Sequence, residues 1–195
     1  MRRKTVVAIA TSILVMAALA GCTEDPSIGS DSNQTGYVAG AAIWKEIKPA
    51  DRKPAASFTT TLDTGAKLTS SSLLGTVHVL NFWYAGCGPC RVEAPRLEAV
   101  YNSYNGTIPF IGVNTYDSAA TAQTFETTHK VTYPSAIDIT TTSVQFAYSG
   151  FVSPDATPTT LVIDRHGRVA ARITGELESN SILSTIIDTV VSEGQ

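Results

Sequence analysis

The feature that most constrains the fold of this chain is a pair of cysteines, Cys87 and Cys90, which follows closely on a run of strand-forming residues. The run covers residues 77–84 (VHVLNFWY) and is apolar and rich in β-branched and aromatic side chains, which predicts a buried central strand. From about residue 87 to residue 104, apolar residues recur at spacings of three and four, which predicts a helix. The sequence therefore predicts a buried strand, a break, and a helix that begins at the first cysteine.

Strands and helices alternate along most of the chain after residue 55. The predicted strands cover residues 58–62, 77–84, 108–114, 133–137, 160–164 and 169–173, and the predicted helices cover residues 87–104, 117–130, 140–148 and 178–191. The last two strands flank a turn at residues 165–167 and form a predicted β-hairpin. This order predicts an α/β fold in which helices flank both faces of a central mixed β-sheet.

The first 22 residues have the pattern of a bacterial lipoprotein signal. Three basic residues at positions 2–4 precede an apolar stretch over residues 6–20, which is short for a membrane-spanning helix. The stretch ends in residues 19–22 (LAGC), which resemble a lipobox, the site where signal peptidase cuts before a cysteine that carries the lipid. We therefore expect Cys22 to be lipidated. The alternative is an ordinary secretory signal whose cleavage site adjoins a cysteine.

These signals divide the chain into three predicted parts, which are a lipoprotein signal peptide (1–21), a lipid-anchored flexible spacer (22–54) and a folded domain (55–195). Residues 23–36 are mostly small and polar, a composition that cannot bury a core. The anchor would hold the domain on the extracytoplasmic face of the cell membrane, where disulfides persist.

Charge argues against a nucleic-acid partner. The whole chain has a formal net charge of −3, and removal of residues 1–21 takes away three basic residues and no acidic one, which leaves −6. A domain this acidic, with no remaining basic cluster, lacks the positive surface that phosphate groups require. We expect no nucleic-acid binding.

The cysteine pair carries the predicted chemistry. With Cys22 assigned to the lipid, only Cys87 and Cys90 remain, and so close a pair opens and closes on itself or reacts with another molecule. A helix N-terminus favours the thiolate, so Cys87 is the predicted nucleophile and Cys90 the thiol that resolves the mixed disulfide. Gly88 leaves room for the backbone of a partner, and Pro89 fits the first helical turn, where a missing N–H costs little.

Three other interpretations of the pair stay open at this point. It could be half of a zinc site, but four ligands are required and His78, His129 and His166 show no ligand spacing, so we expect no metal. It could be a static disulfide, which would close a very small loop. It could also serve a peroxidase. No nucleotide or flavin motif is present in the sequence, and we expect no cofactor.

The segment around the cysteines resembles a known family. Residues 81–95 (NFWYAGCGPCRVEAP) look like the active-site segment of the extracytoplasmic TlpA/ResA-type thiol-disulfide oxidoreductases of the thioredoxin-like superfamily. The positions that match the family pattern are Asn81, Phe82, Trp83, Cys87, Cys90, Glu93 and Pro95. The resemblance covers about residues 55–190 and implies a thioredoxin-like fold, with residues 117–143 as the family's helix-and-strand insertion.

The resemblance also assigns roles to further residues. In the family, a glutamate at the position of Glu93 lies near the thiols and moves protons to and from them, which would require a pKa raised by burial. The alternative is a solvated helix glutamate such as Glu98. Thr157 and Pro158 match the loop whose cis X-Pro bond presents the backbone of residue 157 to a substrate strand, the alternative being an ordinary trans proline.

One position departs from the family pattern. The residue before the first cysteine is usually Trp, which would form a flat apolar wall beside the disulfide, whereas this chain has Gly86. Glycine exposes more of the site and permits unusual backbone angles. Tyr84 is the nearby aromatic residue expected to replace part of that wall. We expect the departure to affect partner specificity, not thiol chemistry.

Taken with the residues, the resemblance implies an extracytoplasmic enzyme that reduces disulfides in client proteins, with apocytochrome c among the candidate clients. A membrane electron donor of the CcdA/DsbD type would restore the dithiol. Two other functions stay open, which are a DsbA-like disulfide oxidase and a thiol-dependent binding or chaperone module without turnover. The Gly-Pro dipeptide between the cysteines, which is that of thioredoxin, favours reduction.

Overall fold

The structure, a computed structural model, describes residues 42–194. The predicted signal peptide, the lipidation at Cys22 and the spacer up to residue 41 lie outside these residues. Among the described residues, no helix combines the length and the apolar character needed to cross a membrane.

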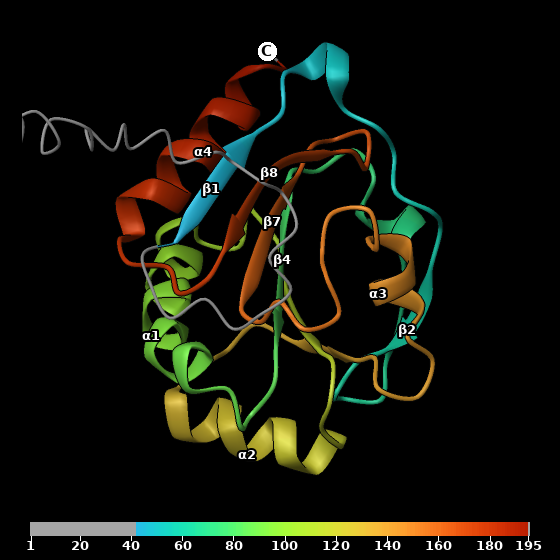
Figure 1. Cartoon of the computed structure of the whole chain (residues 1–195), viewed down its shortest axis with the longest axis vertical. Helices are drawn as coiled ribbons and strands as arrows, with labels where there is room; N and C mark the ends of the chain where they lie inside the picture. The colour runs from blue at the N-terminus through green and yellow to red at the C-terminus, as the bar shows by residue number, and fades with distance from the viewer. Residues whose placement is uncertain (1–41, 195) are drawn as a thin grey trace, which may run out of the picture. The chain divides into compact units, whose positions relative to one another are not determined.

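A six-stranded mixed sheet forms the centre of the domain, in the order β1-β8-β7-β4-β5-β6 (Figure 1). Its strands are β1 (Ile43–Glu46), β4 (His78–Trp83), β5 (Phe110–Asn114), β6 (Ser135–Ile137), β7 (Thr159–Ile163) and β8 (Val169–Thr174). Strand β4 lies parallel to β5 and antiparallel to β7, which places the strand before the cysteines in the middle of the sheet. This position matches the prediction of a buried central strand.

Helices cover both faces of the sheet. They are α1 (Gly88–Ser103), α2 (Ala119–His129), α3 (Ser143–Ala147) and α4 (Asn180–Ser192), with short 3-10 helices η1 (Pro49–Asp51) and η2 (Ser70–Leu73). Helices α1 and α4 pack together on one face, while α3 and the two-stranded sheet of β2 (Thr59–Thr61) and β3 (Lys67–Thr69) lie on the other (Figure 1). The predicted thioredoxin-like α/β fold is confirmed, and the predicted insertion contains α2 and β6.

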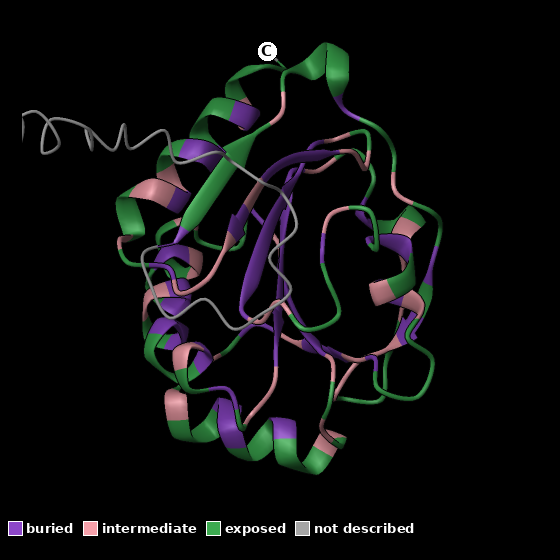
Figure 2. Cartoon of the chain, in the orientation of Figure 1, coloured by how far each residue is buried: buried purple, intermediate pink, exposed green. Residues whose placement is uncertain are grey.

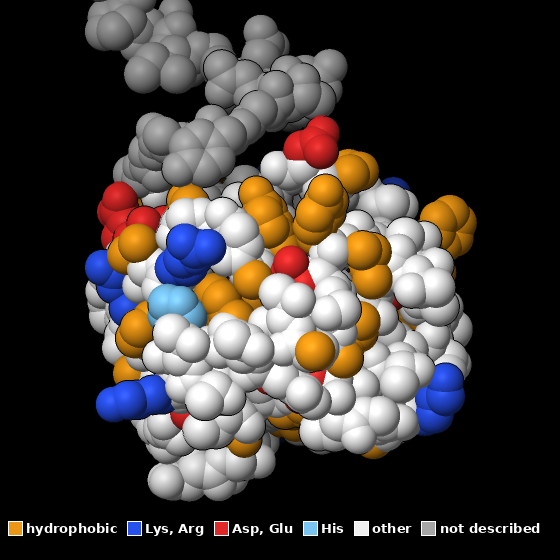
Figure 3. Space-filling view, turned by 90° about the horizontal axis from the view of Figure 1, so that it is seen from below, with side chains coloured by type: hydrophobic (Ala, Val, Ile, Leu, Met, Phe, Trp, Pro, Cys, Tyr) orange, Lys and Arg blue, Asp and Glu red, His pale blue; other side chains and the backbone are white. Residues whose placement is uncertain are grey.

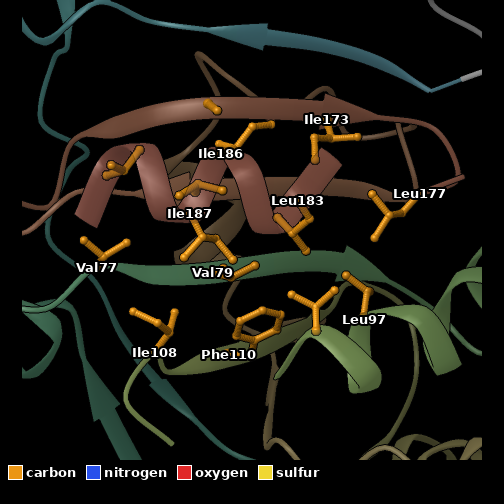
Figure 4. Close-up of a cluster of buried hydrophobic side chains, with 14 of the residues drawn as sticks. Val77, Val79, Leu97, Ile108, Phe110, Ile173, Leu177, Leu183, Ile186 and Ile187 are labelled. Atoms are coloured by element: carbon orange, nitrogen blue, oxygen red, sulfur yellow. The ribbon is translucent and has the colours of Figure 1, made fainter. Parts of the chain in front are cut away.

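The alternation of side chains along β4 divides the core between the two faces. Val79 points into the cluster under α1 and α4, which also contains Leu97 and Leu183 (Figure 4). The adjacent residues Leu80 and Phe82 belong to the cluster on the α3 side. All six residues of β4 are buried, as Figure 2 shows for the central strands. Because β4 is fixed on both faces, the segment that leaves its C-terminal end has a well-defined position.

The structure corrects the predicted boundary of the spacer at residue 54. Residues Ile43–Glu46 form the edge strand β1, which pairs antiparallel with β8, although all four of its side chains are exposed. Farther along, the buried Arg52 forms ion pairs with Asp164 (3.3 Å) and Glu193 (2.5 Å). The spacer prediction failed here because an exposed edge strand has no apolar alternation and because its stabilising contacts come from distant residues.

Candidate active site

Cys87 caps the N-terminus of α1, and Cys90 lies in its first turn. The backbone N–H of Cys90 donates a hydrogen bond to Sγ of Cys87 at 3.2 Å, and the two sulfurs form a disulfide. Helix N-termini leave such N–H groups without partners in the helix, and their partial positive charge favours a thiolate at this position. When the disulfide opens, the same N–H is in place to stabilise a Cys87 thiolate.

Both cysteines are buried in this oxidised state, with 3% of Cys87 and 2% of Cys90 exposed. They are covered because the aromatic residues Trp83 and Phe125 pack into the same cluster. Cys87 nevertheless lines a cleft of about 590 Å³. The covered sulfur of Cys87 therefore adjoins a hollow in the surface.

Glu93 lies one helical turn beyond Cys90 and is 1% exposed. Its two carboxyl oxygens accept hydrogen bonds from Nδ2 of Asn81 (2.8 Å) and from the backbone N–H of Leu177 (2.9 Å). Burial raises the pKa of Glu93 to about 7, although these two hydrogen bonds oppose the shift. The shift has the direction that a proton carrier near neutral pH requires, while the transfer of protons to and from the thiols remains a prediction.

Asn81 links the glutamate to the sheet. Its Nδ2 donates both to Glu93 and to Oγ1 of Thr160 at 3.0 Å, so that β4, β7 and α1 meet at the buried carboxyl. Asn81 matches the family pattern, but no role for it was predicted from the sequence. The alternation of side chains along β4 could have indicated a role, because it places the polar Asn81 on the face that packs against the cysteine-bearing helix.

Of the predicted substrate-binding residues, Thr157 lines the same cleft as Cys87. The Thr157–Pro158 bond is cis, as predicted. Gly88 is exposed, with no other side chain within 4 Å of the position that a Cβ would occupy, and Pro89 is half-buried within the first turn of α1. The arrangement leaves space beside the disulfide, and the roles of these residues in substrate binding remain predictions.

A second carboxylate holds the loop between β4 and α1. Oδ2 of Asp117 accepts hydrogen bonds from the backbone N–H of Ala85 (2.6 Å) and from Nδ2 of Asn114 (2.9 Å). In the sequence, Asp117 is only the first residue of the predicted helix 117–130, and the structure assigns the cap of α2 to Ser118. The available signal was the position of Asn114 and Asp117 after β5, because the C-terminal ends of parallel neighbours meet at one edge.

The histidines named in the sequence analysis do not join the cysteines. Within residues 42–194, no group of three or more His, Cys, Asp or Glu side chains is arranged to hold a metal ion. The described site contains two sulfurs, a carboxyl bound to Asn81 within β4, and a polar loop at the C-terminal end of that strand.

Comparison with known proteins places these features in context. The sequence matches the Redoxin family over residues 48–187. It is 30% identical over 125 residues to the thiol-disulfide oxidoreductase ResA of Bacillus cereus, covering 64% of this chain and 69% of that protein. The ResA protein of Bacillus subtilis is 31% identical over 119 residues, covering 60% and 64%. The chain thus spans about two thirds of the length of these relatives.

Solved structures give the same fold. A DsbF homologue from Corynebacterium diphtheriae superposes with a TM-score of 0.67 at 26% identity and covers 79% of this chain and 97% of its own. A secreted thiol-disulfide isomerase from Corynebacterium glutamicum gives a TM-score of 0.66 at 25% identity, covering 80% and 98%. The Redoxin match over residues 48–187 includes the cysteine-bearing helix α1.

Proposed function

This chain belongs to the Redoxin family and is a thiol-disulfide oxidoreductase of the ResA type, and from this premise we propose that it reduces disulfides in client proteins at the extracytoplasmic face of a cell membrane. The observation that carries the proposal is the hydrogen bond from the N–H of Cys90 to Sγ of Cys87, at the start of a helix whose next turn carries the buried Glu93. Reduction is favoured over oxidation by the Gly-Pro dipeptide between the cysteines.

The proposed reaction has two exchange steps. The Cys87 thiolate attacks one sulfur of a client disulfide, so that a Cys87–client disulfide forms and the other client sulfur leaves as a thiolate. Cys90 then loses its proton to the Glu93 carboxylate and attacks Sγ of Cys87. The second client sulfur leaves as a thiolate and is protonated, the client has gained two electrons, and the Cys87–Cys90 disulfide of the structure has formed.

Trapping tests this mechanism directly. With the reduced protein, iodoacetamide at neutral pH should modify Cys87 faster than free cysteine, because the helix start favours the thiolate. Cys90→Ser should accumulate a mixed disulfide with a client, whereas Cys87→Ser should accumulate none and should not reduce insulin. If position 87 reacts no faster than free cysteine and Cys90→Ser traps nothing, the proposed function is wrong.

The direction of exchange is tested by the reduction potential. A value close to that of thioredoxin, about −270 mV, supports reduction, whereas a value close to that of DsbA, about −120 mV, supports oxidation. Client protection that persists when both cysteines are replaced by serine would instead indicate a binding or chaperone module. Restoration of the dithiol requires a reductant, for which we propose a membrane donor of the CcdA/DsbD type.

The proposed location depends on Cys22. Residues 2–4, the apolar stretch and the LAGC sequence have the spacing of a lipoprotein signal, and a lipid on Cys22 would tether the domain to the membrane. In cell fractionation, wild-type protein should be in the membrane fraction and Cys22→Ala should not, with Cys87→Ser as a matched cysteine control that stays in the membrane. Equal distribution of all three proteins would exclude the anchor. Apocytochrome c is the proposed client, and mixed disulfides trapped in cells with Cys90→Ser would identify it.

A further inference from the structure

The space beside the active-site turn is filled by Tyr84. A Cβ built on Gly86 would lie only 3.0 Å from Cε2 of Tyr84 and 3.4 Å from its Cδ2. A larger residue at position 86 would therefore displace the tyrosine ring, and glycine permits the ring to lie against the turn. The aromatic surface that a tryptophan at position 86 would supply is replaced by one that comes from two positions earlier in the chain.

Tyr84 does not act alone, because its ring packs against that of Tyr116. The ring centroids are 5.8 Å apart and the planes are tilted by 52°. Tyr116 is 71% exposed, so most of its ring is available to another molecule. Hydrophobic side chains gather on the face of the molecule seen in Figure 3, which is the α2 side of Figure 1. An exposed aromatic ring that packs on a partly buried one is a favourable contact surface for apolar side chains.

The loop that carries Tyr116 is fixed to the active-site turn. The backbone N–H of Tyr116 donates to Oδ1 of Asn114 at 3.1 Å. Its neighbour Asp117 accepts from the N–H of Ala85, which directly follows Tyr84. The backbone segments that carry the two rings are thus held in position before any client arrives, which reduces the entropy lost on binding.

The aromatic pair forms one side of the cleft that contains Cys87. The residues that line this cleft are Tyr84, Cys87, Thr115, Tyr116, Gln145, Pro154, Asp155 and Thr157. Asp155 is the charged residue among them, and Thr157 belongs to the cis-proline loop. A client cysteine that reacts with Cys87 must enter between these groups, with its neighbouring residues beside the tyrosines.

We propose that Tyr84 and Tyr116 select clients that carry an aromatic side chain next to the reacting cysteine, with a basic side chain beyond it that faces Asp155. This proposal rests on the proposed function, since it concerns how a client disulfide approaches Cys87. Aromatic rings attract each other in tilted and offset arrangements such as that of the tyrosine pair, and a cation complements the carboxylate.

Short peptides test the selection without an electron donor. Each peptide carries one cysteine as a mixed disulfide with thionitrobenzoate, whose release is followed by absorbance in a single turnover of the reduced protein. The three sequences are Cys-Phe-Lys, Cys-Ser-Lys and Cys-Phe-Glu. We expect the Phe-Lys peptide to react about threefold to tenfold faster than the Ser-Lys peptide, the range for one aromatic contact. The Phe-Glu peptide should be slower at low salt.

Variants show which residues produce the preference. The double variant Tyr84→Ala/Tyr116→Ala should lose the Phe-over-Ser ratio, whereas Tyr84→Phe/Tyr116→Phe should keep it. Tyr116→Ala alone, at an exposed site, should reduce the ratio without affecting folding. Asp155→Asn should reduce the Lys-over-Glu ratio. Trp44, an exposed aromatic residue on β1, supplies the matched control, and Trp44→Ala should leave both ratios unchanged.

The rate with hydroxyethyl disulfide, which has no peptide side chains, separates this proposal from the proposed function. Equal peptide rates together with a fast reaction of hydroxyethyl disulfide would overturn the selection alone. A Phe-over-Ser ratio that persists in Tyr84→Ala/Tyr116→Ala would overturn it as well. If the reduced protein reacts with every disulfide no faster than free cysteine does, the proposed function is wrong.

Discussion

Glu93 is the residue at which the needs of folding and of catalysis oppose each other. Glu93 is 1% exposed, and the main compensation for its carboxylate is the pair of hydrogen bonds from Asn81 and Leu177. A protonated carboxyl is easily accommodated there, whereas a carboxylate loses its hydration. The same burial that makes the charged form costly brings the pKa to about 7, where a group accepts and returns protons readily.

The first prediction concerns stability. The pKa of Glu93 is about 7 in the folded protein against 4.5 for the unperturbed group. Between these pH values the folded protein keeps a proton that the unfolded chain has released, so the contribution is complete below pH 4.5 and is lost as the pH rises through 7. The unfolding free energy should fall by on the order of 3 kcal/mol, because each unit of difference between the two pKa values corresponds to about 1.4 kcal/mol. Urea unfolding at several pH values should show this decline in wild type.

Glu93→Gln is the matched comparison for this decline, because glutamine keeps the shape of the side chain and does not titrate. The difference in unfolding free energy between the two proteins should change between pH 4.5 and 7 and be constant outside that range. Parallel curves would show that burial of this carboxyl does not control the pH dependence.

The second prediction concerns the resolving step. If Glu93 accepts the proton of Cys90 as proposed, its replacement should slow attack on the mixed disulfide at neutral pH, toward the lower end of the roughly 10²–10⁴-fold range of general acid–base catalysis. The measurement is a stopped-flow rate of client release against pH, in which Glu93→Gln should remove the inflection near pH 7. A rate that falls while the inflection stays would assign Glu93 a structural role only.

The site residues predicted from the sequence and those that were missed differ in the sequence separation of their contacts. Cys87, Cys90 and Glu93 lie within seven residues of one helix, so their spacing alone places them together. The cis bond before Pro158 was predicted from a family pattern. Asp117 and Tyr116 act on a turn about 30 residues earlier, and contacts between separate loops leave no periodic signal in a single sequence.

At the scale of elements, the junction of β4 and α1 depends on a partner from the next strand. The N–H of Ala85 would lack a partner in either element, and Asp117 supplies the acceptor from the loop after β5. The parallel pairing of β4 and β5 brings the ends of the two strands together, which makes this bond possible. The sheet therefore positions the nucleophile through the loops at its edge as well as through the strand itself.

The third prediction tests this junction. Asp117→Ala should lower the unfolding free energy by about 1–3 kcal/mol, the cost of removing a charged acceptor from a backbone donor. It should also lower the insulin-reduction rate, because the turn before Cys87 is released. Asp117→Asn keeps an acceptor oxygen and should restore most of both. The exposed Asp51 of η1 gives the control, for which Asp51→Ala should match wild type. Equal rates in Asp117→Ala and wild type would exclude the positioning role.

Element prediction succeeded where burial produced a clear pattern. The helix at residues 178–191 was expected from its apolar face, and α4 covers Asn180–Ser192 with Leu183 and Ile187 buried. Strands β1 and β3 were not predicted, because β1 is exposed on all four residues and β3 has three residues with one charged side chain. Such strands are stabilised by their partners, so their own sequence carries little of the information.

At the scale of the molecule, the segment before residue 55 belongs to the domain. Strand β1 extends the central sheet by pairing with β8, and Arg52 connects this segment to two distant parts of the chain. Asp164, at the start of the β7–β8 turn, and Glu193, just after α4, both contact the Arg52 guanidinium. The segment thus closes one edge of the sheet and ties the turn to the last helix.

The fourth prediction compares two truncated proteins. A chain that begins at residue 42 keeps β1 and Arg52 and should unfold at the same temperature as the full chain. A chain that begins at residue 55 loses both and leaves part of a buried charge cluster without its cation. Its unfolding free energy should fall by about 3 kcal/mol, which lowers the unfolding temperature by on the order of 10 °C for a domain of this size. Arg52→Ala in the longer chain should reproduce part of the loss, and Lys53→Ala at an exposed neighbouring site should reproduce none. Equal unfolding temperatures for the two truncated chains would show that the folded domain begins at residue 55. The edge strand would then contribute nothing to the stability of the sheet.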